Sequence, residues 1–188
     1  MLRQMMATGL MTVALAGCGN GDDDRDFADV ERETLDMLGD VSSLGISPAL
    51  FLPTSGTASY DGYLGAADTS GAIIGDLDLT ADFGADSISG TASNFIDEEN
   101  TEYTGRLTIS NGDIFRTADP ATEYQIAADV NGTLSTDEAR TSVNAIMLGD
   151  FFGGSQQGVA GILRGTTTDQ FGTTLLDGSN SGFVAERR

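Results

Sequence analysis

The chain has 188 residues, and its 29 acidic side chains outnumber nine basic ones, which gives a formal net charge of −20 at pH 7. Nucleic-acid binding needs a basic surface, so we expect no nucleic-acid partner. The sequence contains no His, which removes the usual general base and the usual zinc, copper or haem ligand. We therefore predict a protein that is not an enzyme and carries no cofactor, with catalysis by carboxylates as the weaker alternative.

The N-terminal residues have the pattern of a bacterial export signal. Arg3 supplies a positive charge, and residues 7–16 form a mostly apolar run. This run is too short for a membrane-spanning helix, which needs about twenty residues, and it fits a signal segment that is removed after export. The next residues, Leu15-Ala16-Gly17-Cys18, resemble the bacterial lipobox, and this resemblance implies cleavage before Cys18 and acylation of Cys18. The alternatives are an ordinary secretory signal or a buried thiol.

Cys18 is the only cysteine, so the fold must hold without an internal disulfide. Acyl chains on Cys18 would anchor the protein to a membrane, because each buried methylene contributes about 0.8 kcal/mol. Gly19 stands where an Asp would resemble an inner-membrane retention signal, so we expect the outer membrane.

We divide the chain into a signal peptide (residues 1–17), an acylated tether (18–53) and a β-barrel domain (54–188). The tether begins with an acidic, glycine-containing run, residues 19–26, which cannot bury enough apolar area to fold. This run has some likeness to a calcium loop but lacks its alternation and its closing Glu, so we favour a solvated spacer. Apolar spacing after it predicts a short helix over residues 27–38, which ends at Gly39.

Apolar and polar residues alternate in the third part of the chain, which is typical of strands with one buried face. In one run Leu77 and Leu79 point to one side, and Asp76 and Asp78 to the other. Turn signals separate eight such runs, at residues 57–64, 73–83, 87–95, 102–110, 124–134, 143–152, 158–166 and 182–187.

This pattern predicts an all-β fold, a single antiparallel eight-stranded up-and-down barrel around one core. Closure removes sheet edges that would otherwise pair with another chain. Four glycines on the inward faces fit the sharp bends of a small barrel: Gly62, Gly90, Gly105 and Gly161. The outward faces carry Asp, Glu and Thr instead of an apolar band, so we expect a soluble barrel and not a transmembrane one.

Several segments resemble the transferrin-binding protein B β-barrel family of lipoproteins. These segments are Gly149-Asp150-Phe151-Phe152-Gly153, Val159-Ala160-Gly161, residues 182–188, and the strand pair containing residues 79–83 and 87–90. The chain departs from the family pattern at Gly154, Gln156 and Gly158, where Pro, Ala and Glu are usual. It also has one barrel, whereas transferrin receptors have two lobes.

The resemblance implies an acylated surface lipoprotein whose barrel captures a protein or an iron- or haem-bearing ligand, with a surface-lipoprotein translocator as a further partner. It transfers no ligand-contact residue to this sequence. The hypothesis is therefore a lipid-anchored outer-membrane protein, at the cell surface or facing the periplasm, that acts as a binding module. The alternative is a structural envelope lipoprotein without a soluble ligand.

Two acidic groups are candidate cation ligands: Asp76, Asp78 and Asp82 share a strand face, and Asp97-Glu98-Glu99 lie in a predicted loop. For both groups we favour plain solvated carboxylates. Gly153-Gly154 lacks the Lys-Ser/Thr of a phosphate loop. Residues Phe151 and Phe152 must face opposite sides of a strand, so one belongs to the core, and the other is exposed, lies against a partner or lies under a covering loop. Arg187-Arg188 either pairs with carboxylates to hold the C-terminal strand or is free.

Overall fold

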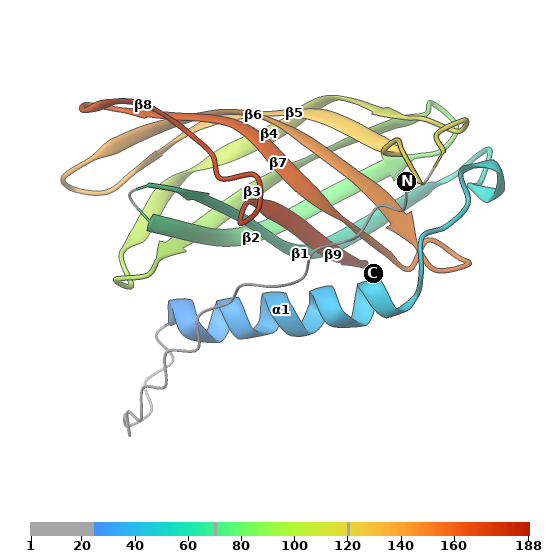
Figure 1. Ribbon diagram of the computed structural model, residues 1–188, viewed down its shortest axis with the longest axis horizontal. Coiled ribbons are helices and arrows are strands. Elements are labelled where there is room, and N and C mark those ends of the chain that lie inside the picture. Colours follow the sequence, from blue (N-terminus) through green and yellow to red (C-terminus); the bar gives the residue numbers. More distant parts are fainter. Residues whose placement is uncertain (1–24, 70, 120) are drawn as a thin grey trace.

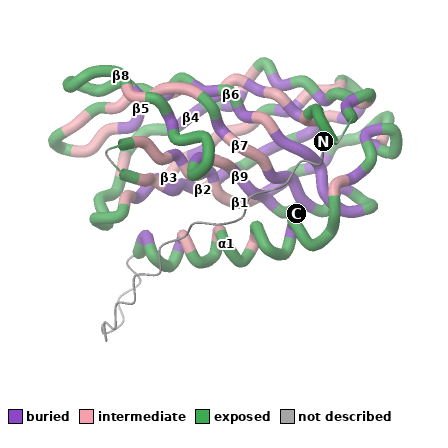
Figure 2. The backbone as a smooth tube through the Cα atoms, viewed as in Figure 1, coloured by how far each residue is buried: buried purple, intermediate pink, exposed green. Residues whose placement is uncertain are grey.

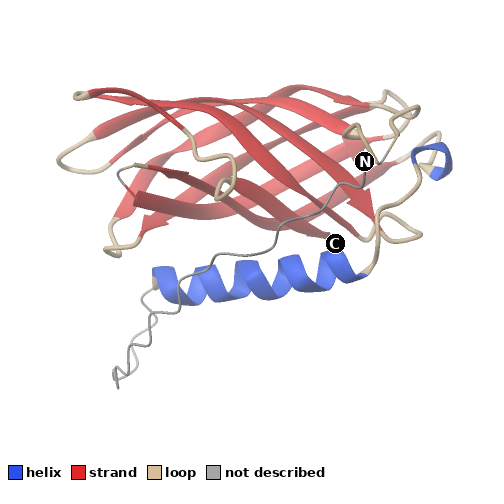
Figure 3. Cartoon of the chain, in the orientation of Figure 1, coloured by secondary structure: helices blue, strands red, loops and turns tan. Residues whose placement is uncertain are grey.

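The computed structural model describes residues 25–188, except 70 and 120, and places eight long strands in a closed barrel with one helix along its outside (Figures 1 and 3). The helical elements are α1 (Phe27–Ser43) and the short 3-10 helix η1 (Ala49–Phe51). The strands are β1 (Thr57–Asp68), β2 (Gly71–Asp82), β3 (Ser87–Asp97), β4 (Glu102–Ile114), β5 (Ile126–Ser135), β6 (Arg140–Phe152), β7 (Gly158–Asp169), β8 (Gly172–Leu175) and β9 (Gly182–Arg187). All eight predicted runs form strands. Strand β8 was not predicted.

The topology is up-and-down. Each strand from β1 to β7 pairs antiparallel with the next, and β9 pairs with both β7 and β1, which closes the ring. Strand β8 also pairs with β7, beyond the part of β7 that β9 covers. Strands β8 and β9 are thus two segments of one return strand, interrupted by residues 176–181. The predicted eight-stranded antiparallel barrel is confirmed.

The core lies inside the barrel, where the inward side chains of all eight long strands meet. Figure 2 shows that buried residues alternate with more exposed ones along the strands. Residues predicted to face inward are almost completely buried, among them Leu64, Leu77, Leu107 and Ile109. Burying one such side chain contributes about 1.5–3 kcal/mol. Their outward neighbours, such as Asp78 and Thr80, are exposed. The alternation therefore separates a dry interior from a polar wall, as predicted.

Glycines allow the strands to approach closely. A Cβ on Gly161 would lie 2.0 Å from the carbonyl oxygen of Leu148 on β6, and one on Gly90 would lie 2.0 Å from that of Asp78 on β2. No side chain fits at such a distance, so these positions require glycine.

Helix α1 is longer than the sequence predicts. Asp26 caps its N-terminus, where the carboxylate accepts a hydrogen bond from the backbone N–H of Ala28 at 2.8 Å. The predicted stop, Gly39, lies inside the helix. The helix ends at Ser43, and Gly45 adopts φ 72°, the left-handed conformation that commonly follows a helix.

Helix α1 packs on the barrel wall mainly through its two ends. Near its N-terminus, Phe27 and Val30 cover outward-facing Ile74 and Ile96. Near its C-terminus, Val41 packs with a second outward cluster, Phe152, Ala160 and Val184. Between the two clusters, residues 31–40 are all described and none is buried. The helix is therefore held along the length of the barrel by two separate apolar contacts.

Gly158→Ala tests the second contact, because a Cβ on Gly158 would lie 2.7–2.8 Å from the methyl groups of Val41. We expect a loss of about 1–3 kcal/mol in the free energy of unfolding and faster proteolysis within α1, since overpacking displaces the helix. Urea titration and limited proteolysis measure both effects. The matched control is Gly154→Ala, whose Cβ would meet no atom within 4 Å. Equal behaviour of the two variants would contradict this packing.

Candidate binding surface

The interior of the barrel is a packed core. Near one end of this core, the ring of Phe151 lies 6.2 Å from that of Tyr60 and 5.5 Å from that of Phe83, between ring centroids, in tilted arrangements. Small barrels of eight strands are commonly filled in this way. Ligand contacts on the described part of the chain therefore have to be made on the outer wall or at the ends.

The segment between α1 and β1 folds across one end of the barrel and is fixed there by buried polar contacts. Ser47 donates its backbone N–H to the carbonyl of Phe151 at 2.8 Å. The side chain of Gln125 is fully buried, donates to the carbonyl of Ser47 and accepts the N–H of Phe151 at 3.1 Å. Because Gln125 and Ser47 satisfy groups on three segments, this end of the barrel is closely tied together.

Arg116, in the connection between β4 and β5, holds the same segment from the other side. Its guanidinium donates to the carbonyls of Leu52 at 3.1 Å and Phe83 at 2.5 Å, and it pairs with Asp86 at 2.6 Å. Leu52 itself is buried in the core. Helix η1 is thus anchored directly after its last residue.

Large apolar side chains are exposed at this anchored end. Leu50 and Phe51 of η1 are 84% and 76% exposed, and Phe115, beside Arg116, is 44% exposed. We call these three residues the end patch. Acidic residues of the same β4–β5 connection, Asp119 and Glu123, are also exposed. This patch was not predicted, because Leu50 and Phe51 fall within the predicted tether, although residues 49–52 form an uncharged apolar run before a proline.

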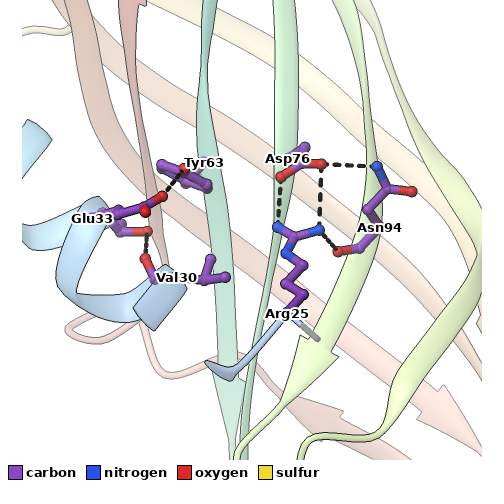
Figure 4. A network of polar contacts seen from close by, with 7 residues as sticks. Arg25, Val30, Glu33, Tyr63, Asp76 and Asn94 are labelled. Carbon is purple, nitrogen blue, oxygen red and sulfur yellow. Dashed lines mark hydrogen bonds and ion pairs between the residues drawn. The ribbon is translucent and has the colours of Figure 1, made fainter. Parts of the chain in front are cut away.

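The described chain begins at the opposite end of the barrel, where a polar network fixes it (Figure 4). Arg25 pairs with Asp76 on β2 at 2.5 Å and donates to the carbonyl of Asn94 on β3 at 2.5 Å. Asn94 adopts φ 53° at a β-bulge, and its amide also donates to Asp76 at 2.8 Å. The backbone N–H of Phe27 bonds to the side chain of Asn100 in the β3–β4 turn at 2.9 Å.

Tyr63, further along the helix, donates to the carboxylate of Glu33 at 2.6 Å (Figure 4). Desolvation, followed by the hydrogen bond and negative charge of Glu33, raises the pKa of Tyr63 to about 12.

The predicted carboxylate groups do not converge on a cation site. Asp76 pairs with Arg25, Asp78 pairs with Arg188, and Asp82 accepts the backbone N–H groups of the β2–β3 turn. Asp97 accepts N–H groups of its own turn. Among the described residues, no group of His, Cys, Asp or Glu is arranged to hold a metal ion.

Arg188 pairs with two carboxylates, Asp61 and Asp78, that lie directly opposite each other on β1 and β2. Opposed like charges destabilise a sheet, and the guanidinium offsets their repulsion. Arg187 donates to the carbonyl of Ser155 at 2.8 Å. Of the two alternatives for these arginines, pairing with carboxylates holds for Arg188, whereas Arg187 bonds to a backbone carbonyl.

For the Phe151-Phe152 pair, the predicted split between a core ring and an outward ring is confirmed, but the outward ring is covered by a helix and not by a loop or a partner. Phe151 lies in the barrel core, and Phe152 faces outward beneath the end of α1. The lipobox residues Leu15, Ala16, Gly17 and Cys18 fall outside the described residues. Of the helices that are described, none has the length and apolar character needed to cross a membrane.

Comparison with models of known protein families gave no match, and a search of curated proteins gave none. The barrel architecture is thus established by the structure, whereas the likeness to the transferrin-binding protein B family rests on the sequence segments alone.

Tyr60→Phe tests the core at alkaline pH. Burial raises the pKa of Tyr60 to about 12, against the opposing charge of Arg187. Since the unfolded group has a pKa of about 10, the folded state binds more protons between these values. Stability should therefore be complete below about pH 10 and fall as the pH rises toward 12.

In Tyr60→Phe this alkaline decline should become shallower. At neutral pH the variant should lose about 1 kcal/mol, because the carbonyl of Gln156 loses the phenol hydrogen bond of 3.1 Å. Urea unfolding at a series of pH values measures both effects, and parallel curves for the two proteins would refute the assignment.

Proposed function

We propose that the protein is a lipid-anchored outer-membrane lipoprotein, acylated at Cys18, whose β-barrel is a non-enzymatic binding module for another protein. In this proposal it is a single-barrel relative of the transferrin-binding protein B family. The lipobox and the family-like strand segments support the anchor and the relationship. The packed core supports a protein ligand over haem, because haem requires a pocket that removes most of its surface from water.

The observation that carries the proposal is that the start of the described chain and the end patch lie at opposite ends of the barrel. The described chain starts at the β3–β4 turn, and the end patch lies at the other end, beyond the C-terminus of α1 (Figure 1). Cys18 precedes Arg25 by seven residues, which span at most about 25 Å when extended. A 12-residue strand such as β2 is about 40 Å long. A lipid on Cys18 would therefore leave the end patch directed away from the bilayer.

Cys18→Ala tests the anchor. In the bacterium that makes this protein, the native chain should partition into the detergent phase of Triton X-114, and the variant into the aqueous phase, because the acyl chains are absent. Mass spectrometry of the N-terminal peptide should show acylation only in the native chain. Unchanged partitioning of the variant would refute the anchor.

Protease treatment of intact cells tests exposure at the cell surface. We expect the barrel to disappear from treated cells while a periplasmic marker protein survives, since the proposed partner is outside. Protection of the chain until the outer membrane is permeabilised would contradict the surface location and favour a structural role in the envelope.

A further inference from the structure

We propose that the end patch of Leu50, Phe51 and Phe115 is the docking surface for a partner protein whose contact region is apolar at its centre and basic at its border. This inference rests on the proposed binding function and assigns that function a surface and a class of partner. Three observations carry it: the exposure of the patch, its rigid support and the charge around it.

The exposure of Leu50 and Phe51 is much higher than that of most large apolar side chains in the described chain. Leaving two adjacent large apolar groups in water forgoes the free energy that their burial would contribute to folding. Large apolar anchors of this kind carry much of the affinity in protein interfaces. Their neighbours Ala49 and Leu52 are buried at the same end of the barrel, so η1 faces the barrel with those residues and directs Leu50 and Phe51 into solvent.

The support of the patch is rigid. Arg116 fixes the carbonyl of Leu52, and the side chain of Gln125 fixes that of Ser47, so both sides of η1 are tied to the barrel. Phe115 is the residue before Arg116 and donates its backbone N–H to the carbonyl of Gln125 at 2.8 Å. A preorganised surface loses little conformational entropy on binding, which favours affinity. The exposed side chains are therefore held in place for contact.

The charge around the patch selects the partner. Asp119 and Glu123 are exposed on the β4–β5 connection that carries Phe115, and the guanidinium of Arg116 is neutralised by Asp86. With a net charge of −20, a second copy of this chain or an anionic lipid surface meets like charge. A basic border on the partner is attracted, and it accelerates association.

The chain offers a matched control for the apolar part. Phe171 and Leu175, on the β7–β8 hairpin, are 88% and 76% exposed but lie at the end where the described chain begins. Leu50→Ser/Phe51→Ser and Phe171→Ser/Leu175→Ser therefore remove similar apolar areas from opposite ends. Circular dichroism and thermal unfolding establish that each variant is folded.

The probe is a fluorescein-labelled peptide with a Leu-Trp-Leu-Trp centre and two lysines on each side, titrated by fluorescence anisotropy against the full-length chain in non-ionic detergent. We expect saturable binding below about 1 mM, and a loss of about tenfold or more in Leu50→Ser/Phe51→Ser. Phe171→Ser/Leu175→Ser should bind as the native chain does. Peptides with glutamate flanks or a serine centre should bind at least about tenfold more weakly.

The acidic border is tested by Asp119→Asn/Glu123→Gln, which keeps the acceptor oxygens that these side chains use within the loop. It should weaken binding of the lysine-flanked peptide and reduce its dependence on salt between about 50 and about 500 mM NaCl. The control, Asp137→Asn/Glu138→Gln, removes two exposed carboxylates from the β5–β6 turn at the other end and should change neither property.

Absence of peptide binding, or equal losses in the two serine variants, would overturn the docking surface. Two other results would also overturn it by identifying another occupant. One is a dimer in sedimentation that Leu50→Ser/Phe51→Ser dissociates. The other is binding to phosphatidylcholine vesicles by the Cys18→Ala chain that the same substitutions abolish. If the peptide does not bind but detergent partitioning still depends on Cys18, the docking surface is wrong and the lipid anchor stands. The two experiments therefore distinguish failure of the docking proposal from failure of the anchor.

Discussion

Closure of the backbone hydrogen-bond ring is the constraint on which the rest of the structure depends. With β9 between β7 and β1, each long strand has two neighbours, and the chain achieves this without a disulfide. A ring of eight strands leaves an interior only wide enough for side chains, so Tyr60, Phe83 and Phe151 fill it and glycines such as Gly161 admit the close approach of strands. Among the described residues, a filled interior leaves the outer wall and the ends of the barrel as the surfaces open to contact.

Three arginines of this acidic chain have structural positions. Arg25 holds the start of α1, Arg116 holds η1, and Arg188 pairs with two aspartates that face each other on β1 and β2. Each pair is partly exposed and screened by solvent, so by itself it contributes little to stability. Their combined effect is positional, because they attach the segments outside the strands to the barrel. The remaining exposed carboxylates keep the outer wall strongly negative, and this sign limits which partners can approach.

Much of the fold could be predicted because a barrel strand shows its environment in its sequence. Alternation identified every long strand, and the adjacent pair Phe151-Phe152 correctly implied one inward and one outward ring. What failed depends on contacts between distant segments. The C-terminal turn of α1 is stabilised by Val41 on the cluster around Phe152, which no local pattern reveals. Gln125 and Arg116 act through carbonyls of other segments, so nothing in their neighbourhood marks them. The apolar run at 49–52 is visible in the sequence. That two of its residues are exposed at a fixed position depends on the contact between Arg116 and the carbonyl of Leu52, which the sequence does not show.

The interrupted return strand has a consequence for the order of folding. Residues 182–187 of β9 follow every other strand in the sequence, yet they supply the pairing that joins β1 to β7. A chain made from its N-terminus can form the β1–β7 meander early, but it keeps two open edges until β9 arrives, and open edges recruit other chains. During that interval, electrostatic repulsion between the acidic outer faces of neighbouring chains opposes pairing at these edges.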